Sequence, residues 1–190
     1  MTDNNDEINS RERYYTLEEA IEFYNRIERP DLTLDELVLL TLGLLGKPIN
    51  GRVVFHKEIF LLYNELRERD IKIVNPYYIK YKYGPFSFNI ALTIEYLGYD
   101  KFINIKKRSI KRTRYELTDK GRRWVYKIIN DLEDRLGADY IENLRRLRKG
   151  WDQLGHEGIL KYVCQNYPTY INRSARKKDF IDMDWGAPEA

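Results

Sequence analysis

The densest cluster of one sign of charge lies in the stretch KKRSIKRTR, residues 106–114. It holds six cations and no acid: Lys106, Lys107, Arg108, Lys111, Arg112 and Arg114. Lys and Arg bind phosphate oxygens, and a row of them grips a nucleic-acid backbone without reading its bases. The alternative is a solvated hairpin that uses charge to keep its edge from pairing with another chain. A solvated surface usually mixes signs because like charges repel, so the unmixed cluster favours phosphate binding.

The charge of the whole chain is segregated around this cluster. Residues 101–127 carry 11 Lys and Arg against two Asp and Glu, whereas residues 1–100 carry 12 against 17. A segregated basic block is better support for a nucleic-acid partner than the net charge of +3. Arg122 and Arg123 extend the block into the first turn of a following helix, where cations oppose the helix dipole. That unfavourable position suggests a nearby anion.

Other residue types that could support catalysis or metal binding are sparse. The two histidines, His56 and His156, have no second ligand at a metal-binding spacing, and Cys164 is the single cysteine. GKPING (46–51) lacks the Lys-Ser/Thr of a phosphate-binding loop and the spacing of a dinucleotide-binding turn. Cys164 is interpreted as a small buried thiol. We therefore expect a non-enzymatic protein with no cofactor and no metal.

The elements that must position the basic cluster are mostly helical. Capping boxes at Thr16–Glu19 and Thr33–Glu36 predict two helix starts. Periodicity and breakers predict helices over about 17–28, 34–45, 53–69, 86–97 and 119–135, the last opened by Thr118 as N-cap. The second is apolar nearly all round and is expected at the centre. In the third, an apolar stripe runs through Phe55, Ile59, Leu62 and Leu66 and leaves Lys57, Glu65 and Arg67 outside.

Two runs with period-2 alternation flank the basic cluster. In FINIKKR (102–108), Ile103 and Ile105 alternate with Phe102 and Asn104. In RTRYELT (112–118), Thr113, Tyr115 and Leu117 alternate with Arg112, Arg114 and Glu116. This pattern predicts a β-hairpin with a buried face and a charged tip, not a disordered basic arm. Ahead of it, the aromatic run up to Tyr83 predicts a short strand. Gly84-Pro85 predicts a break, with Pro in the first turn of the next helix.

The helix over 86–97 admits two interpretations. Its polar residues, Ser87, Asn89 and Thr93, have side chains that can read base edges in a major groove. Yet this face carries no Lys or Arg and includes Glu95, although a groove-reading helix usually also grips phosphates. The alternative is a protein-binding surface formed by Phe88, Leu92 and Tyr96.

A near-heptad seam marks the C-terminal half. Its apolar residues recur at spacings of four and three: Tyr140, Leu144, Leu147, Trp151 and Leu154. The seam serves equally well as a homodimer contact or as a surface packed on the chain's own helices. GILKYVCQNYP predicts one more short helix that ends before Pro168.

The order of helices followed by a hairpin and a helix predicts a mainly α fold with a small β-hairpin, a winged helix-turn-helix domain with additional N- and C-terminal helices. The expected organisation is a disordered acidic N-terminus (1–13), the winged-helix domain with its N-terminal helix (14–136), a C-terminal helical extension (137–175) and a frayed tail (176–190).

Three stretches carry a resemblance to known proteins: HKEIFLLYNEL (56–66), YKYGPFSFNIALTIEYL (81–97) and RYELTDKGRRW (114–124). They resemble the prokaryotic winged-helix proteins of the YwgA-like and Panacea-domain (antitoxin-like) group, which share a Tyr-Gly-Pro element ahead of a helix. ILKYVCQNYPTYINRS (159–174) is similar to the closing helix of the YwgA-like proteins. The resemblance spans roughly residues 33–174 and implies transcription-regulator or toxin-neutralising roles, with no catalytic residues.

Composition and hydropathy bear on location and partners. The longest apolar run, residues 37–46, is too short to span a bilayer, and the polar, acidic start is unlike a secretory signal. We expect a cytoplasmic protein whose partner is double-stranded DNA, with a homodimer or a protein partner such as a toxin as alternatives.

Overall fold

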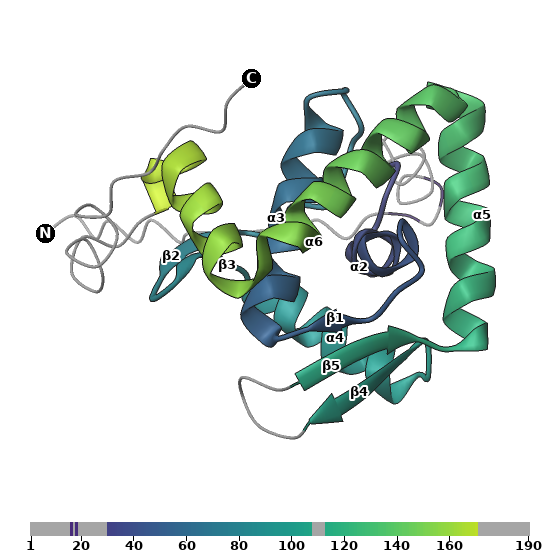
Figure 1. Ribbon diagram of the computed structural model, residues 1–190. Coiled ribbons are helices and arrows are strands. Elements are labelled where there is room, and N and C mark those ends of the chain that lie inside the picture. The colour runs from purple at the N-terminus through teal and green to yellow at the C-terminus, as the bar shows by residue number, and fades with distance from the viewer. Residues whose placement is uncertain (1–15, 17, 19–29, 108–112, 171–190) are drawn as a thin grey trace, which may run out of the picture.

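The computed structural model describes residues 16, 18, 30–107 and 113–170. Within these ranges the chain forms five α-helices and two small antiparallel sheets (Figure 1). The helices are α2 (Leu34–Gly43), α3 (Arg52–Arg67), α4 (Phe88–Tyr99), α5 (Asp119–Leu136) and α6 (Ala138–Asn166). The strands are β1 (Ile49–Asn50), β2 (Ile79–Tyr81), β3 (Gly84–Phe86), β4 (Ile103–Lys107) and β5 (Thr113–Leu117), and a 3-10 turn, η2, spans Pro168–Tyr170. The prediction of a mainly helical chain with a small hairpin is confirmed.

Several sequence predictions fall on residues outside the described ranges. These are the acidic N-terminus, most of the helix over 17–28, the hairpin tip with Arg108, Lys111 and Arg112, and the tail over 176–190.

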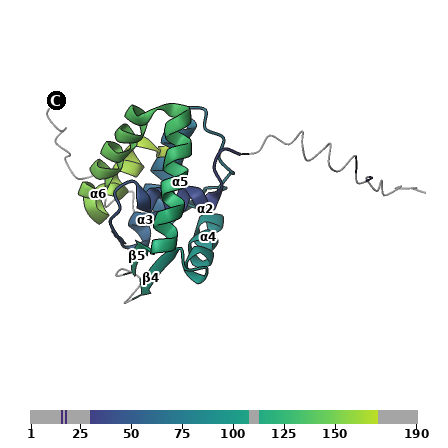
Figure 2. The ribbon, with the colours of Figure 1, turned by 90° about the vertical axis from the view of Figure 1, so that its right-hand side faces the viewer.

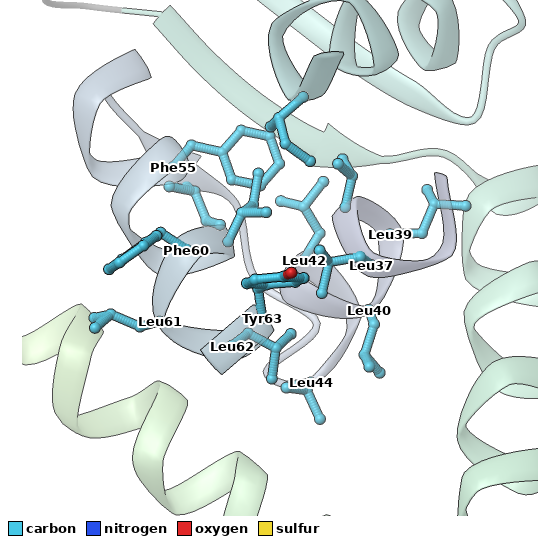
Figure 3. Close-up of a cluster of buried hydrophobic side chains, with 14 of the residues drawn as sticks. Leu37, Leu39, Leu40, Leu42, Leu44, Phe55, Phe60, Leu61, Leu62 and Tyr63 are labelled. Carbon is cyan, nitrogen blue, oxygen red and sulfur yellow. The ribbon is translucent and has the colours of Figure 1, made fainter. Parts of the chain in front are cut away.

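Helix α2 is the centre on which the other elements pack. Six consecutive residues, 37–42, are buried, and the helix contacts α3, α4, α5 and β5. A helix that is apolar on all sides must be covered on all sides. Figure 3 shows its leucines meeting the aromatic and leucine side chains of α3. The predicted capping box is confirmed, since Thr33 Oγ1 accepts from the Glu36 N–H at 3.3 Å while the Glu36 carboxylate accepts from the Thr33 N–H at 2.8 Å.

The predicted hairpin forms and carries an additional strand. Its sheet has the order β1-β5-β4, with Tyr115 paired to Ile49 on one side and to Ile105 on the other. Thr113, Tyr115 and Leu117 are buried, as the alternation predicts, and the Tyr115 ring packs on Phe55 of α3 with centroids 4.7 Å apart. Strand β1 was not predicted, because its two residues are too few to show a period.

A second hairpin, β2–β3, precedes α4. The predicted strand near Tyr83 is confirmed as β2, but the prediction that Pro85 opens the next helix is wrong. Pro85 lies in β3, paired with Lys80, and α4 begins at Phe88 with Ser87 as its N-cap. Gly84, with φ +87°, provides the left-handed backbone that the tight turn between these strands requires.

Helix α6 crosses α3 and is broken at Gly155, whose φ of 64° is left-handed (Figure 1). A buried ion pair ties the two helices together: Arg148 Nη2 lies 2.8 Å from Glu58 Oε2, and both side chains are fully buried. These two atoms are paired by charge and do not form a hydrogen bond with each other. Arg148 Nε also donates to the Thr41 carbonyl oxygen of α2 at 3.2 Å. One guanidinium thus joins three helices.

Burial raises the pKa of Glu58 to about 8, against the lowering effect of Arg148. Removing the cation leaves an unpaired buried carboxyl. We expect Arg148→Met to lower the free energy of unfolding by about 3–5 kcal/mol at pH 9, where the buried Glu58 carboxylate loses its partner. The loss should be smaller at pH 6, because the Glu58 carboxyl is protonated below its pKa of about 8. Urea denaturation at pH 6 and pH 9 measures the difference.

The matched control is Arg145→Met, which removes a partly exposed cation whose ion pair with Glu142 spans 3.4 Å, and we expect it to cost less than about 1 kcal/mol. The double variant Glu58→Leu/Arg148→Met should regain most of the loss. An Arg148→Met protein as stable as the control would contradict the structural role of the pair.

Candidate functional site

Helix α4 lies at the edge of the molecule, on the side opposite α6 (Figure 2). One face of α4 packs on α2 and β4 through Ile90, Ile94 and Leu97, which are buried as their spacing predicts. The helix begins where Ser87 Oγ accepts from the Ile90 N–H at 3.0 Å. The same hydroxyl donates to the Pro76 carbonyl oxygen, so the N-cap also anchors the preceding segment.

The opposite face of α4 is exposed and apolar. Its four large side chains, which we call the apolar α4 face, are Phe88, Leu92, Tyr96 and Tyr99, exposed by 60%, 56%, 66% and 86%. No Lys or Arg lies on the helix. Isolated exposed apolar residues are ordinary, but four on one helix face form a patch of the kind that binds another protein.

The three predicted base-reading residues do not share this face. Ser87 is fully buried as the N-cap, and Thr93 is 8% exposed. Asn89 alone of the three is exposed. Of the three side chains predicted to read bases, only Asn89 is therefore accessible to DNA.

A row of aromatic rings connects the apolar α4 face to the interior. The His56 ring of α3 stacks on Phe86 with centroids 5.0 Å apart, and Phe86 meets Phe88 edge-on at 5.1 Å. Burial lowers the pKa of His56 to about 3, so the imidazole is neutral and packs as an apolar ring. Phe88 is thus held in place by its contact with Phe86, although its outer side is exposed.

Lys57 fixes the strand that leads into α4. It was predicted to lie outside the apolar stripe of α3, but the structure buries it to 3% exposure, because β3 and α6 cover that side of the helix. Its Nζ donates to the Pro85 carbonyl oxygen at 2.6 Å. Burial lowers the pKa of Lys57 to about 7. The amine therefore sits near its titration point at neutral pH.

A hollow adjoins the C-terminal half of the apolar α4 face. It lies between α4 and β4 and is lined by Tyr96, Gly98, Tyr99, Ile103, Ile105 and Lys107, among others. The two elements approach closely here, since a Cβ added to Gly98 would lie 2.7 Å from Ile105 Cδ1. Glycine at 98 thus permits the contact that shapes the hollow.

The described cations of the β4–β5 hairpin form what we call the basic hairpin surface: Lys106, Lys107 and Arg114. Their side chains are 65%, 61% and 46% exposed. Each lies near an acid, because Lys106 Nζ and Arg114 Nε are both 3.6 Å from Glu116, and Lys107 Nζ reaches Glu95 of α4 at 2.9 Å. These acids partly offset a charge that the sequence shows as unmixed.

Arg122 and Arg123 follow on α5. Arg122 donates to the Leu117 carbonyl oxygen at 2.9 Å and to Asp119 at 2.6 Å, so the anion expected near it is supplied by the chain itself. Its guanidinium also holds the pKa of Asp119 below the usual range. Arg123 is exposed.

The C-terminal seam packs mainly on the chain's own helices. Leu144 and Trp151 are buried, and Tyr140 and Leu147 are half-buried against the core, whereas Leu154 is 40% exposed. Of the two interpretations of the seam, these positions correspond to packing within the chain.

Within the described part of the chain, no cluster of three or more His, Cys, Asp or Glu is arranged to hold a metal ion. Cys164 is half-buried, and burial raises the pKa of its thiol. Of the helices in residues 30–107 and 113–170, none is both long and apolar enough to cross a membrane.

No protein-family model, curated protein or solved structure matches this chain. The resemblance to the YwgA-like and Panacea-domain group therefore stays a prediction.

Sequence reasoning missed Tyr99 and the Lys107–Glu95 ion pair. Tyr99 was missed because the helix was predicted to end at about residue 97, whereas α4 continues to Tyr99. The two residues of the ion pair are twelve positions apart, and they meet only because β4 folds back beside α4.

The buried amine of Lys57 predicts a pH dependence of stability. Its folded pKa of about 7 lies below the usual lysine pKa of 10.5, so the unfolded chain binds more protons between these two pH values. Stability is therefore gained as pH rises from about 7 toward 10, by at most about 1.4 kcal/mol per pH unit. Urea denaturation at pH 7.5 and 9.5 should show this gain in Cys164→Ser protein, where the neighbouring thiol cannot titrate.

The further change Lys57→Met should remove the gain, since methionine fills the space without a charge. An equal gain in the Lys57→Met/Cys164→Ser protein would contradict the assignment to Lys57.

Proposed function

We propose that this protein is a non-catalytic winged-helix module that binds a partner protein through the apolar α4 face. The order of helix α2, strand β1, helices α3 and α4, and the hairpin β4–β5 supports the winged-helix assignment, with α5 and α6 as additions. The resemblance to regulators and antitoxin-like proteins points the same way. A cytoplasmic location is part of the proposal and accords with a single cysteine in 190 residues.

One observation carries the proposal: the helix in the recognition position exposes four large apolar side chains and no cation. A major-groove helix works through polar and charged contacts to bases and phosphates. Here the exposed centre of the helix is Leu92, flanked by aromatic rings. Burying such a surface against another protein lowers the free energy by about 25 cal/mol per Å² of apolar area.

Site-specific photo-crosslinking tests this function. A benzophenone amino acid at Leu92, in the full chain expressed in its own cells, should give adducts of higher mass because the side chain lies in the contact. The same group at Tyr126, which is 68% exposed on α5, serves as the control. Adducts from Tyr126 but none from Leu92 would reject the apolar α4 face as the binding surface.

We propose phosphate binding by the basic hairpin surface as a second function. Its support is that three cations remain about half or more exposed, and that exposed ion pairs contribute only about 0–1 kcal/mol each and exchange readily for phosphate. Double-stranded DNA is the partner that such a surface fits, through its backbone rather than its bases.

A fluorescence-anisotropy titration with random duplex DNA tests this second function. If about five phosphates are neutralised, log affinity should fall with log salt at a slope of about −4.5. The double change Lys106→Gln/Arg114→Gln should flatten the slope by up to about 1.8 because two phosphate contacts are lost. The same charge change at two exposed cations of α6, Arg146→Gln/Lys149→Gln, should leave the slope unaltered. Equal slopes for both double variants would show that the hairpin does not bind phosphate.

A further inference from the structure

The N-terminal half of α5 exposes a tryptophan among cations. The helix runs along the outer side of the molecule (Figures 1 and 2). Four of its exposed residues are spaced three and four apart, which places them on one face. These residues, which we call the α5 aromatic–basic surface, are Lys120, Arg123, Trp124 and Lys127. The surface shares no residue with the apolar α4 face or with the basic hairpin surface.

The cations of the α5 aromatic–basic surface are not compensated as those of the hairpin are. Residues 120–130 include four cations and no acid. Of these four, Arg122 pairs with Asp119. In the described part of the chain, no ion pair joins the other three to an acid. The surface is therefore a positive patch that suits an anionic ligand.

The indole ring of Trp124 is held in place by Phe102. The two rings meet edge-on with centroids 6.1 Å apart, and the Phe102 carbonyl oxygen accepts from the Thr118 N–H at 3.0 Å. Lys127 Nζ lies 5.3 Å from the centroid of the Trp124 ring, within the range of a cation–π contact. Trp124 nevertheless stays 42% exposed. A fixed and partly uncovered ring of this kind can stack on a flat ligand.

A flat anionic ligand is what an unpaired nucleotide provides. Proteins bind single-stranded nucleic acid by stacking bases on aromatic rings while Lys and Arg contact the phosphates. Lysine is depleted in protein–protein interfaces, which disfavours a protein ligand on this surface. A membrane is disfavoured because an interfacial tryptophan must enter the headgroup layer, whereas Trp124 is less than half exposed and held against Phe102.

We propose that the α5 aromatic–basic surface binds single-stranded nucleic acid, with an unpaired base stacked on Trp124 and the adjoining phosphates contacted by Arg123 and Lys127. Lys127 moves from the ring to a phosphate when the base takes its place. Lys120 has a different role, because its Nζ donates to the Asp100 carbonyl oxygen at 3.0 Å and lies 3.9 Å from the centroid of the Phe102 ring. It therefore holds the ring that supports Trp124.

This inference goes beyond both proposed functions. It does not use the apolar α4 face, and it differs from duplex binding by the hairpin in requiring unpaired bases. In a duplex the bases stack on one another and are not available to a side chain.

The fluorescence of Trp124 tests the stacking. In Trp185→Phe protein the emission comes from Trp124 and from Trp151, which is 6% exposed. Oligo(dT) and oligo(rU) of about 12 nucleotides, at low salt, should quench Trp124 because a base stacks on its ring. Quenching by either strand supports the proposal, and the tighter binder identifies the sugar. No quenching by either strand, or equal quenching by a duplex of the same length, would overturn it.

Substitutions separate stacking from charge. In an anisotropy titration with labelled oligo(dT), Trp124→Leu should weaken binding at least about 5-fold, whereas Trp124→Phe keeps an aromatic face and should lose less. Tyr126→Leu removes a ring that is 68% exposed on another face of α5, and it should leave the affinity unchanged. Circular dichroism checks that the three variants are folded. A Trp124→Leu protein that loses no more affinity than the Tyr126→Leu protein would reject Trp124 as the stacking ring.

Two further measurements identify the alternatives. The affinity for duplex DNA should be unchanged by Trp124→Leu, and an equal loss for duplex and single strand would show that Trp124 does not act by stacking. Anionic vesicles of phosphatidylserine and phosphatidylcholine should leave the fluorescence of the Trp185→Phe protein unchanged. Quenching by the vesicles but not by the oligonucleotides would assign the surface to a membrane and reject the proposal.

Discussion

The arrangement of this molecule depends on a ten-residue helix that has no polar face. Because α2 buries residues 37–42 without interruption, α3, α4, α5 and β5 must all pack around it. The buried Thr41 carbonyl oxygen of α2 accepts a hydrogen bond from the guanidinium of Arg148, which also pairs with Glu58. Burying these two charges costs desolvation free energy. The structural role of the ion pair is to fix the position of α6 across α3.

The position of α4 follows from this core. One face of the helix covers α2, so the other face must point outward, and its character is set by sequence rather than by packing. Rigid support comes from below, through the stacked rings of His56, Phe86 and Phe88 and the hydrogen bond from Lys57 to Pro85. A surface held in this way is preorganised, which lowers the entropic cost of binding.

Local signals predicted much of the fold. Thr33 and Thr118 were identified as N-caps because a side-chain cap is decided within four residues, and the hairpin was identified because Ile103 and Tyr115 belong to clear alternations. Predictions failed where elements distant in the sequence determine whether a residue is buried. Lys57 and Glu58 read as exposed or unremarkable in sequence, and only the approach of β3 and α6 buries them. Ser87 was assigned to base reading because its role as a cap for α4 depends on a strand, β3, that the Gly-Pro pair concealed.

The residues of the candidate site could be predicted from the sequence, but the balance of charge around them could not. The apolar residues of α4 were visible from their spacing, and so were the cations of the hairpin. The sequence did not show that Glu95 and Glu116 lie among those cations, because charge compensation across elements is a tertiary property.

The ion pair between Lys107 and Glu95 makes the two surfaces thermodynamically linked. A ligand that neutralises or displaces Glu95 on α4 leaves Lys107 free for an anion on the hairpin, and an anion that takes Lys107 leaves Glu95 with its charge uncompensated. Linkage requires such an effect to be reciprocal in free energy, whichever site fills first. Since the pair is exposed, the coupling is worth at most about 1 kcal/mol and weakens as ionic strength rises. One ion pair thus couples ligand binding on α4 to ligand binding on the β4–β5 hairpin, and salt weakens that coupling.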